Sequence, residues 1–217
     1  MANNIVAYIG VENFDYILYL TRILAKLDRK VLILDNSESN YFDYLFPTVT
    51  GIDTEREPIT YRHINYGKFG LTEDIINEYD DILISYGMNS NISEHCTRVV
   101  IVSDPFLNNL CTIKNLITQT PCKNQAVLIR NMVNINNGME NIIRELEGLV
   151  EEEKIDFVYI DEADINNAVM CIAEKSFMFA GISRGLKAYL IKEAGIHYPE
   201  LKTRSLQDAF KAARKGD

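Results

Sequence analysis

The chain has 217 residues, of which 47% are hydrophobic and 24% charged, a composition typical of a globular domain with a sizeable buried core. Its formal net charge at pH 7 is −9. Because a protein that binds nucleic acid normally presents a basic face, this charge argues against DNA or RNA as a partner. The chain starts without the basic segment and apolar run of a signal peptide, and no apolar run reaches the roughly 18 residues of a membrane span. We therefore expect one cytoplasmic domain over residues 1–217.

The cysteines and histidines are too scattered for a zinc site or a small disulfide framework. Isolated cysteines of this kind are usually small apolar core residues in a reducing compartment. We therefore expect free thiols and no bound metal. The residues concerned are Cys96, Cys111, Cys122, Cys171, His63, His95 and His197.

Apolar runs of strand length alternate with segments whose apolar residues recur at helical spacing. The runs predict seven strands, over 5–9, 30–34, 59–64, 81–85, 98–102, 125–130 and 156–160. The helical spacing predicts helices over 16–27, 71–78, 105–117, 139–153, 166–179, 183–194 and 201–215. This alternation indicates an α/β fold with a mainly parallel sheet of about seven strands and helices on both faces.

Polar residues and one glycine indicate where some of these helices begin and end. Asp15 and Thr72 each stand where an N-cap side chain would accept a backbone N–H. Gly195 stands where a C-cap would end the helix over 183–194. The helix over 139–153 has an acidic side that ends in residues 151–153, and we interpret this side as a solvated face.

Ligands of parallel α/β sheets bind at the carboxyl ends of the strands, so the loop after the first strand is the first place to look. A phosphate-binding loop needs glycines, converging backbone N–H groups and a lysine. The segment 10–15 (GVENFD) has one glycine, no lysine and two acids. We expect Glu12 and Asp15 to satisfy the helix dipole themselves and to repel a triphosphate, and Phe14 to fill space.

The strand ends also carry a resemblance, which covers most of the chain. "VLILD" matches the second strand of the ParA/MinD family of deviant-Walker P-loop ATPases, and "EYDDILISYG" resembles its Walker B region. "CTRVVIVSDPFLNNLCTIKNLI" resembles the next strand and helix, and "AVLIRNMVN" resembles the strand that ends in an adenine-contacting asparagine. The resemblance implies the P-loop NTPase-like fold of ParA/MinD proteins.

The resemblance also assigns a vestigial nucleotide face, which consists of Gly10, Asn13, Asp35, Ser85, Gly87 and Asn131. Asn131 matches the base-contacting asparagine, and Gly10 is the one loop glycine that remains. Asn13 stands at the helix-start lysine, and Ser85 stands at the Walker B aspartate. Further family positions are occupied by Tyr8 (signature lysine), Phe14 (magnesium-binding hydroxyl) and Ser37 (water-orienting aspartate).

These replacements predict a degenerate member that is catalytically inactive, with no catalytic residue and no nucleotide cofactor. Such a pseudo-ATPase would act as a localisation, scaffold or assembly factor through protein contacts and as a homodimer. Within the family the nearest functional type is TadZ/CpaE-like, which implies a secretion or pilus machine as the partner. Two alternatives stay open: a weak nucleotide-dependent switch with a noncanonical ATP site, and an unrelated α/β enzyme with a small-molecule substrate.

Two further segments have more than one interpretation. The helix over 201–215 is locally basic and resembles the membrane-targeting helix of MinD-type proteins, but its apolar stripe holds only two large residues, Leu206 and Phe210. We expect this helix to pack on the domain rather than on a membrane. The aromatic residues within 41–46 could lie in a dimer face or in the core.

Overall fold

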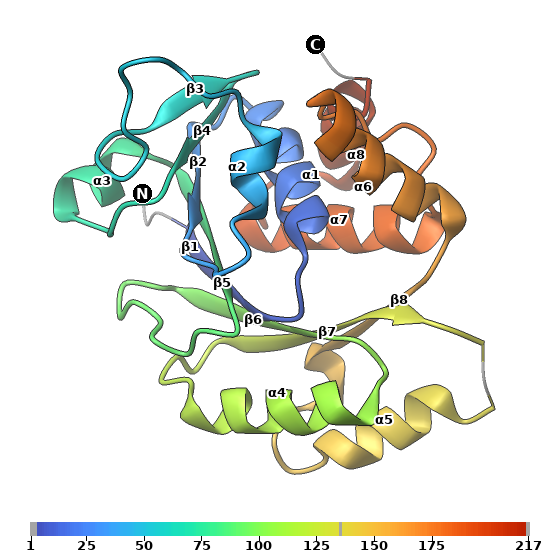
Figure 1. Ribbon diagram of the computed structural model, residues 1–217. Coiled ribbons are helices and arrows are strands. Elements are labelled where there is room, and N and C mark those ends of the chain that lie inside the picture. The colour runs from blue at the N-terminus through green and yellow to red at the C-terminus, as the bar shows by residue number, and fades with distance from the viewer. Residues whose placement is uncertain (1–3, 135, 216–217) are drawn as a thin grey trace.

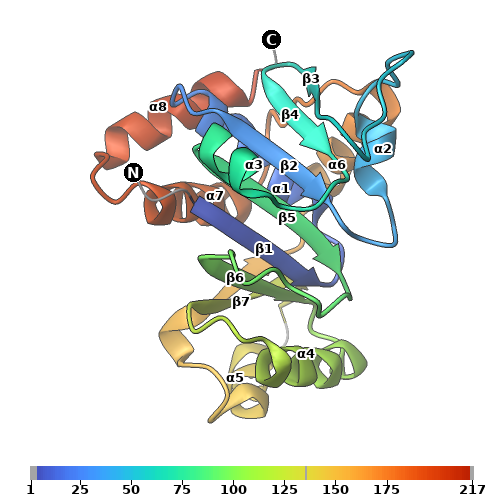
Figure 2. The ribbon, with the colours of Figure 1, turned by 90° about the vertical axis from the view of Figure 1, so that its left-hand side faces the viewer.

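The computed structural model describes residues 4–134 and 136–215. Its strands are β1 (Asn4–Gly10), β2 (Val31–Asp35), β3 (Ile59–Tyr61), β4 (Ile64–Gly67), β5 (Asp81–Gly87), β6 (Arg98–Ser103), β7 (Gln125–Met132) and β8 (Ile155–Tyr159). In the described residues they form one eight-stranded sheet in the order β3-β4-β2-β5-β1-β6-β7-β8, much of which Figure 2 shows side by side. Every neighbouring pair is parallel except β3 and β4.

Helices cover both faces of the sheet. They are α1 (Phe14–Ala25), α2 (Tyr41–Leu45), α3 (Glu73–Glu78), α4 (Leu107–Gln119), α5 (Gly138–Leu146), α6 (Glu162–Glu174), α7 (Arg184–His197) and α8 (Thr203–Ala213). Figure 1 shows α4 and α5 below the sheet, with α1, α6, α7 and α8 on its other side. The predicted α/β fold with a mainly parallel sheet is therefore confirmed.

The unbroken apolar runs arise because each central strand faces a core on both sides. In β1, Val6 and Tyr8 pack into the core under α1, α7 and α8, and Ala7 and Ile9 pack into the core under α4. All four side chains are buried. A strand with two buried faces needs apolar residues at every position, and the sequence of β1 provides them.

One predicted strand is in fact two. The segment over 59–64 turns back at Arg62 and His63, whose φ angles are 50° and 64°, so that Tyr61 pairs with Ile64. Positive φ at both central residues is characteristic of the type I′ turn, whose twist matches that of the two strands it joins. The antiparallel hairpin of β3 and β4 raises the number of strands from the predicted seven to eight.

Glycines explain two wrong helix ends. The helix predicted over 139–153 ends at Leu146, because Gly148 adopts a φ of 77°, and Glu152–Lys154 form a separate 3-10 turn. Gly195 lies inside α7 and not at its end. A Cβ at this position would lie 3.3 Å from Leu206 Cδ1, so glycine lets α8 pack closely on α7.

The aromatic segment contains the short helix α2, which the sequence pattern missed. Phe42, Leu45 and Phe46 are buried, and Tyr44 is 62% exposed, so most of this cluster belongs to the core. The apolar stripe of α8, including Leu206 and Phe210, is buried as expected for a helix that packs on the domain. It offers no apolar face to a membrane.

The state of the cysteines and the lengths of the apolar segments were also predicted from the sequence. The four cysteines are free thiols, as predicted, but only Cys96 and Cys171 are buried core residues, since Cys111 is exposed and Cys122 half-buried. Within 4–134 and 136–215, no helix is long and apolar enough to cross a membrane.

Candidate functional site

The loop after β1 starts at Gly10, which the packing of the sheet requires. Gly10 has a φ of 107°, and a Cβ added there would lie 2.1 Å from the carbonyl oxygen of Val102. The same carbonyl accepts a hydrogen bond of 2.9 Å from the backbone N–H of Val11. Close contact between β1 and β6 is thus sufficient reason for glycine here, without any phosphate.

The N-cap of α1 is Asn13 and not Asp15, which corrects the capping prediction. The Asn13 carbonyl accepts the backbone N–H groups of Tyr16 and Ile17, and its side chain makes no capping hydrogen bond. Asn13 is only 4% exposed, and its amide nitrogen Nδ2 has no hydrogen-bond partner among the described residues. The side chain at the helix-start lysine position therefore lies buried in the loop.

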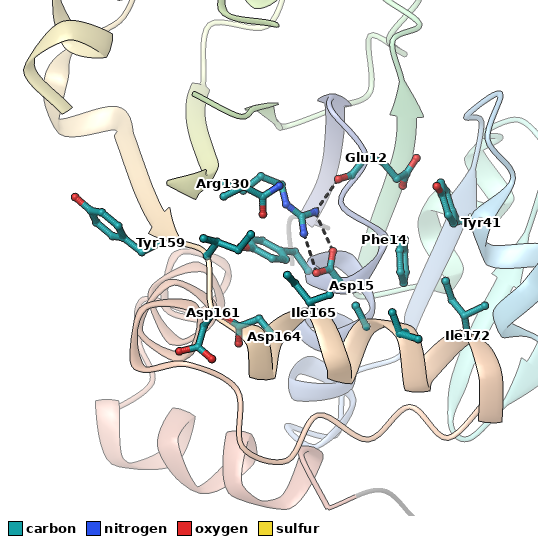
Figure 3. Close-up of a pocket in the computed structure, with 15 residues that line it drawn as sticks. Glu12, Phe14, Asp15, Tyr41, Arg130, Tyr159, Asp161, Asp164, Ile165 and Ile172 are labelled. Atoms are coloured by element: carbon teal, nitrogen blue, oxygen red, sulfur yellow. Dashed lines mark hydrogen bonds and ion pairs between the residues drawn. The ribbon is translucent and has the colours of Figure 1, made fainter. Parts of the chain in front are cut away.

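Asp15 instead forms a buried ion pair with Arg130, a residue that the sequence analysis did not single out. Two nitrogens of the guanidinium each donate to one carboxylate oxygen of Asp15 at 3.0 Å, and Nη1 also donates to the Glu12 carbonyl at 2.6 Å (Figure 3). The guanidinium carbon lies 4.5 Å from the centre of the Tyr16 ring. Burial opposes the charge of Arg130, but Asp15, Tyr16 and Glu12 together raise its pKa.

A backbone irregularity aims Arg130 at this loop. The register between β7 and β8 shifts between Ile129 and Met132, and Asn131 has a φ of 58°. Bulges of this kind redirect side chains at functional sites, and asparagine tolerates the left-handed conformation better than most residues. The asparagine that matches the family's base-contacting residue thus also has a structural reason to be there.

A chain of hydrogen bonds joins the loops after β1 and β2. Glu12 Oε2 accepts from Ser39 Oγ at 2.6 Å, the hydroxyls of Ser39 and Ser37 lie 3.0 Å apart, and Ser37 Oγ donates to Asp35 Oδ1 at 2.5 Å. The backbone N–H groups of Ser37 and Phe42 also donate to Asp35. The Asp35 carboxylate is therefore fully engaged by its own chain.

Burial disfavours the charged forms of the two acids at the ends of this chain of hydrogen bonds. Burial raises the pKa of Glu12 and the pKa of Asp35. The hydrogen bonds that Ser39 donates to Glu12 and Ser37 donates to Asp35 partly offset this effect of burial.

The remaining positions of the predicted nucleotide face lie on neighbouring strands. Ser85 pairs in register with Asp35 on one side and with Tyr8 on the other. Ser85 and Tyr8 are each 2% exposed, so neither side chain reaches the surface of the sheet edge. Gly87 has a φ of 53°, and a Cβ there would lie 3.3 Å from Ser37 Cβ. All six predicted residues thus lie at the carboxyl edge of the sheet.

A pocket of about 330 Å³ opens beside the ion pair, between α1, the ends of β7 and β8, and α6 (Figure 3). Phe14 fills part of this edge, as predicted, and its ring stacks on Tyr41 with centroids 5.0 Å apart. Four acids and one cation are among the described residues that line the pocket. They are Glu12, Asp15, Asp161, Asp164 and Arg130.

Two of these acids organise the backbone around α6. Asp161 caps the helix by accepting the N–H of Ala163 at 2.8 Å, and for this reason α6 begins before the predicted residue 166. Asp164 accepts the N–H of Ser183 at 2.7 Å, and burial raises its pKa. Among the described residues, no group of three or more His, Cys, Asp or Glu side chains is placed to hold a metal ion.

Comparison with known proteins settles the fold. No protein-family model and no curated protein matches the chain. The ParA family ATPase of Chlorobium tepidum TLS is 12% identical, with a TM-score of 0.59 over 98% of both chains. A structure of the MinC:MinD cell division complex from Aquifex aeolicus matches at 13% identity and a TM-score of 0.60, over 99% of this chain and 96% of that chain. The chain has a ParA/MinD-like fold.

Proposed function

We propose that this chain is a catalytically inactive ParA/MinD-like pseudo-ATPase that works in the cytoplasm as a localisation, scaffold or assembly factor. The observation that carries the proposal is the charge of the loop at the start of α1. This loop places the carboxylates of Glu12 and Asp15 at the helix N-terminus, and the nearby cation, Arg130, is committed to Asp15 and to the Glu12 carbonyl. A helix N-terminus with its own carboxylates is already neutralised.

The residues at this edge do not fit Mg-ATP. Phosphate oxygens need free N–H groups and a cation, and Mg²⁺ needs a hydroxyl and a carboxylate with open coordination positions. Here the N–H of Asn13 bonds to Glu12 Oε1 at 3.2 Å, and Asp35 accepts three donors of its own chain. The position of the magnesium-binding hydroxyl is occupied by Phe14, which is stacked on Tyr41.

Exposed apolar side chains support a role in protein contacts at the same edge. They follow β6 and β7 and lie on α6, namely Phe106 (66% exposed), Leu107 (63%), Val133 (47%), Ile165 (47%) and Val169 (57%). The resemblance places a dimer contact at this edge, and Tyr8, at the signature-lysine position, is buried and cannot reach a partner. We assign these apolar residues to a homodimer interface.

The partner is proposed to be a protein. MinD from Aquifex aeolicus was solved as a complex with MinC, so a protein with this fold can bind a second, different protein. A TadZ/CpaE-like role in a secretion or pilus machine is the specific form of the proposal.

The test combines calorimetry with light scattering. ATP and ADP are titrated with Mg²⁺ into the wild-type protein, and no saturable heat and a constant dimer mass are expected. Val169→Glu, in α6, should convert the dimer to a monomer. The control variant is Ile196→Glu, near the C-terminal end of α7, where the side chain is 42% exposed, and it should leave the dimer intact. Saturable Mg-ATP binding or ATP turnover would refute the pseudo-ATPase, and a monomeric wild-type protein would refute the dimer.

A second candidate is the weak nucleotide-dependent switch, which the pocket beside Asn131 favours. Its volume of about 330 Å³ and its aromatic residues, Phe14, Tyr16 and Tyr159, suit a nucleobase. Under this candidate ATP binds weakly, and Asn13→Lys tightens binding because it returns a cation to the helix start. Under the pseudo-ATPase proposal Asn13→Lys binds no better than wild type, since Glu12 and Asp15 remain.

A further inference from the structure

A second polar cavity lies at the amino edge of the sheet, opposite the candidate site. Its volume is about 360 Å³, and it is formed by the end of α1, the turn that follows and the β3–β4 hairpin. Figure 1 shows the end of α1 and this hairpin at the upper edge of the molecule, away from the loop after β1. The proposed function assigns nothing to this cavity.

The charge of the cavity is opposite to that of the whole chain. Its lining includes Arg22, Lys26, Arg29 and Arg62, together with His63 and one acid, Asp28. These residues carry four positive charges and one negative charge, or +3 with neutral histidine, in a chain of net charge −9. Like charges that share one concave surface focus a positive potential and attract an anion.

The backbone of the hairpin is shaped to present two of these side chains. Arg62 and His63 both have positive φ angles, which are unfavourable for residues other than glycine. Asn-Gly is the pair that such a turn prefers. Arg62 donates from Nη1 to the Ser176 carbonyl at 2.9 Å, and this contact holds the guanidinium in place.

Arg29 lines the same cavity. Its guanidinium lies 4.1 Å from the centre of the Tyr198 ring, and its Nη2 is 4.0 Å from Glu200, beyond hydrogen-bond distance. Its Nε is buried and has no hydrogen-bond partner among the described residues. The side chain as a whole is 23% exposed and lines the cavity, so its positive charge is accessible to an anion there.

We propose that this cavity binds a small polyanion, namely pyrophosphate or a molecule with two adjacent phosphate groups, through Arg29 and Arg62. The planar fork of arginine matches phosphate oxygens with paired hydrogen bonds, and Lys26 adds a point charge beside them. The site is independent of the nucleotide face, which lies at the other edge of the sheet.

The probe is inorganic pyrophosphate, titrated calorimetrically without Mg²⁺ into the full chain. Arg62→Asn combined with His63→Gly removes the charge and supplies the turn residues that the hairpin prefers, so the variant should stay folded. Arg184→Gln, on the exposed first residue of α7, is the control for the loss of one positive charge. Circular dichroism confirms that each variant is folded.

We expect one pyrophosphate per chain, binding at least about tenfold weaker in the hairpin variant and unchanged in Arg184→Gln, because only the hairpin variant loses a guanidinium that would donate charge-assisted hydrogen bonds to phosphate oxygens. A wild-type protein that does not bind pyrophosphate overturns the proposal. So does an equal weakening in both variants, which would indicate nonspecific attraction, or binding that persists in the hairpin variant. Binding of a short DNA duplex but not of pyrophosphate would also overturn it.

Discussion

Replacing Arg130 with methionine tests whether the Asp15–Arg130 pair holds the carboxyl edge together. The Asp15 side chain is 4% exposed and that of Arg130 is 14% exposed, so the pair is largely removed from water. Arg130→Met deletes both hydrogen bonds to Asp15 and the bond to the Glu12 carbonyl, and it leaves a buried carboxylate without a counter-charge. Breaking a buried pair in this way costs about 3–5 kcal/mol.

A double-mutant cycle separates this cost from the value of the pair itself. Asp15→Ala, Arg130→Met and the double variant are unfolded in urea and followed by far-ultraviolet circular dichroism, since the chain has no tryptophan. The double variant should lose about 2–3 kcal/mol less free energy of unfolding than the two single variants lose together, because it leaves no unpaired charge. A loss below about 1 kcal/mol in Arg130→Met, or additive effects, would refute the reasoning.

Two further predictions concern the same edge. Glu12→Gln should weaken the dependence of folding stability on pH. The Glu12 pKa is higher in the folded protein than in the unfolded chain, so protonation of Glu12 stabilises the fold. This stabilisation is complete at a pH below the pKa of the unfolded chain and is lost as the pH rises through the pKa of the folded protein. From about pH 4.5 upward, urea unfolding should therefore show wild type losing stability relative to Glu12→Gln, and parallel curves would contradict the raised pKa of Glu12. Gly10→Ala should lower the free energy of unfolding by more than about 3 kcal/mol or prevent folding, because its Cβ would lie 2.1 Å from the Val102 carbonyl oxygen. Gly51→Ala is the control, since Gly51 has a φ of 89° but open space around it, and it should lower the free energy of unfolding by only about 1 kcal/mol. If thermal unfolding shows the same loss of stability in the two alanine variants, the close approach of β6 is not the reason for glycine at position 10.

The fold could be predicted from the sequence because its signals are local. Each buried strand is a short apolar run, and each long helix has its own periodicity. Thr72 illustrates the strength of local signals, since its hydroxyl accepts the N–H of Ile75 as an N-cap, as predicted. The hairpin at Arg62 and His63 escaped prediction because neither residue is typical of a turn that requires positive φ.

The candidate site could be predicted only in part because its chemistry depends on contacts across the chain. The sequence placed the residues after the strands at one edge of the sheet, where the structure has them, and the repulsion of a phosphate by Glu12 and Asp15 stays a prediction from charge. Arg130 lies 115 residues from Asp15, and Ser39 lies 27 residues from Glu12, so no window of sequence contains either pair. Asp15 looked like a cap because its attraction to a distant guanidinium is invisible in the local pattern.

The place of β1 in the sheet has a consequence for synthesis of the protein. β1 is made first, yet its two neighbours are β5, which begins at Asp81, and β6, which begins at Arg98. At roughly 5–20 residues per second, a ribosome takes about 4–14 seconds to proceed from the end of β1 to the start of β5. During that interval an apolar strand with two faces to bury has no sheet to join. Nascent chains of this protein should therefore be clients of ribosome-associated chaperones until β6 has emerged.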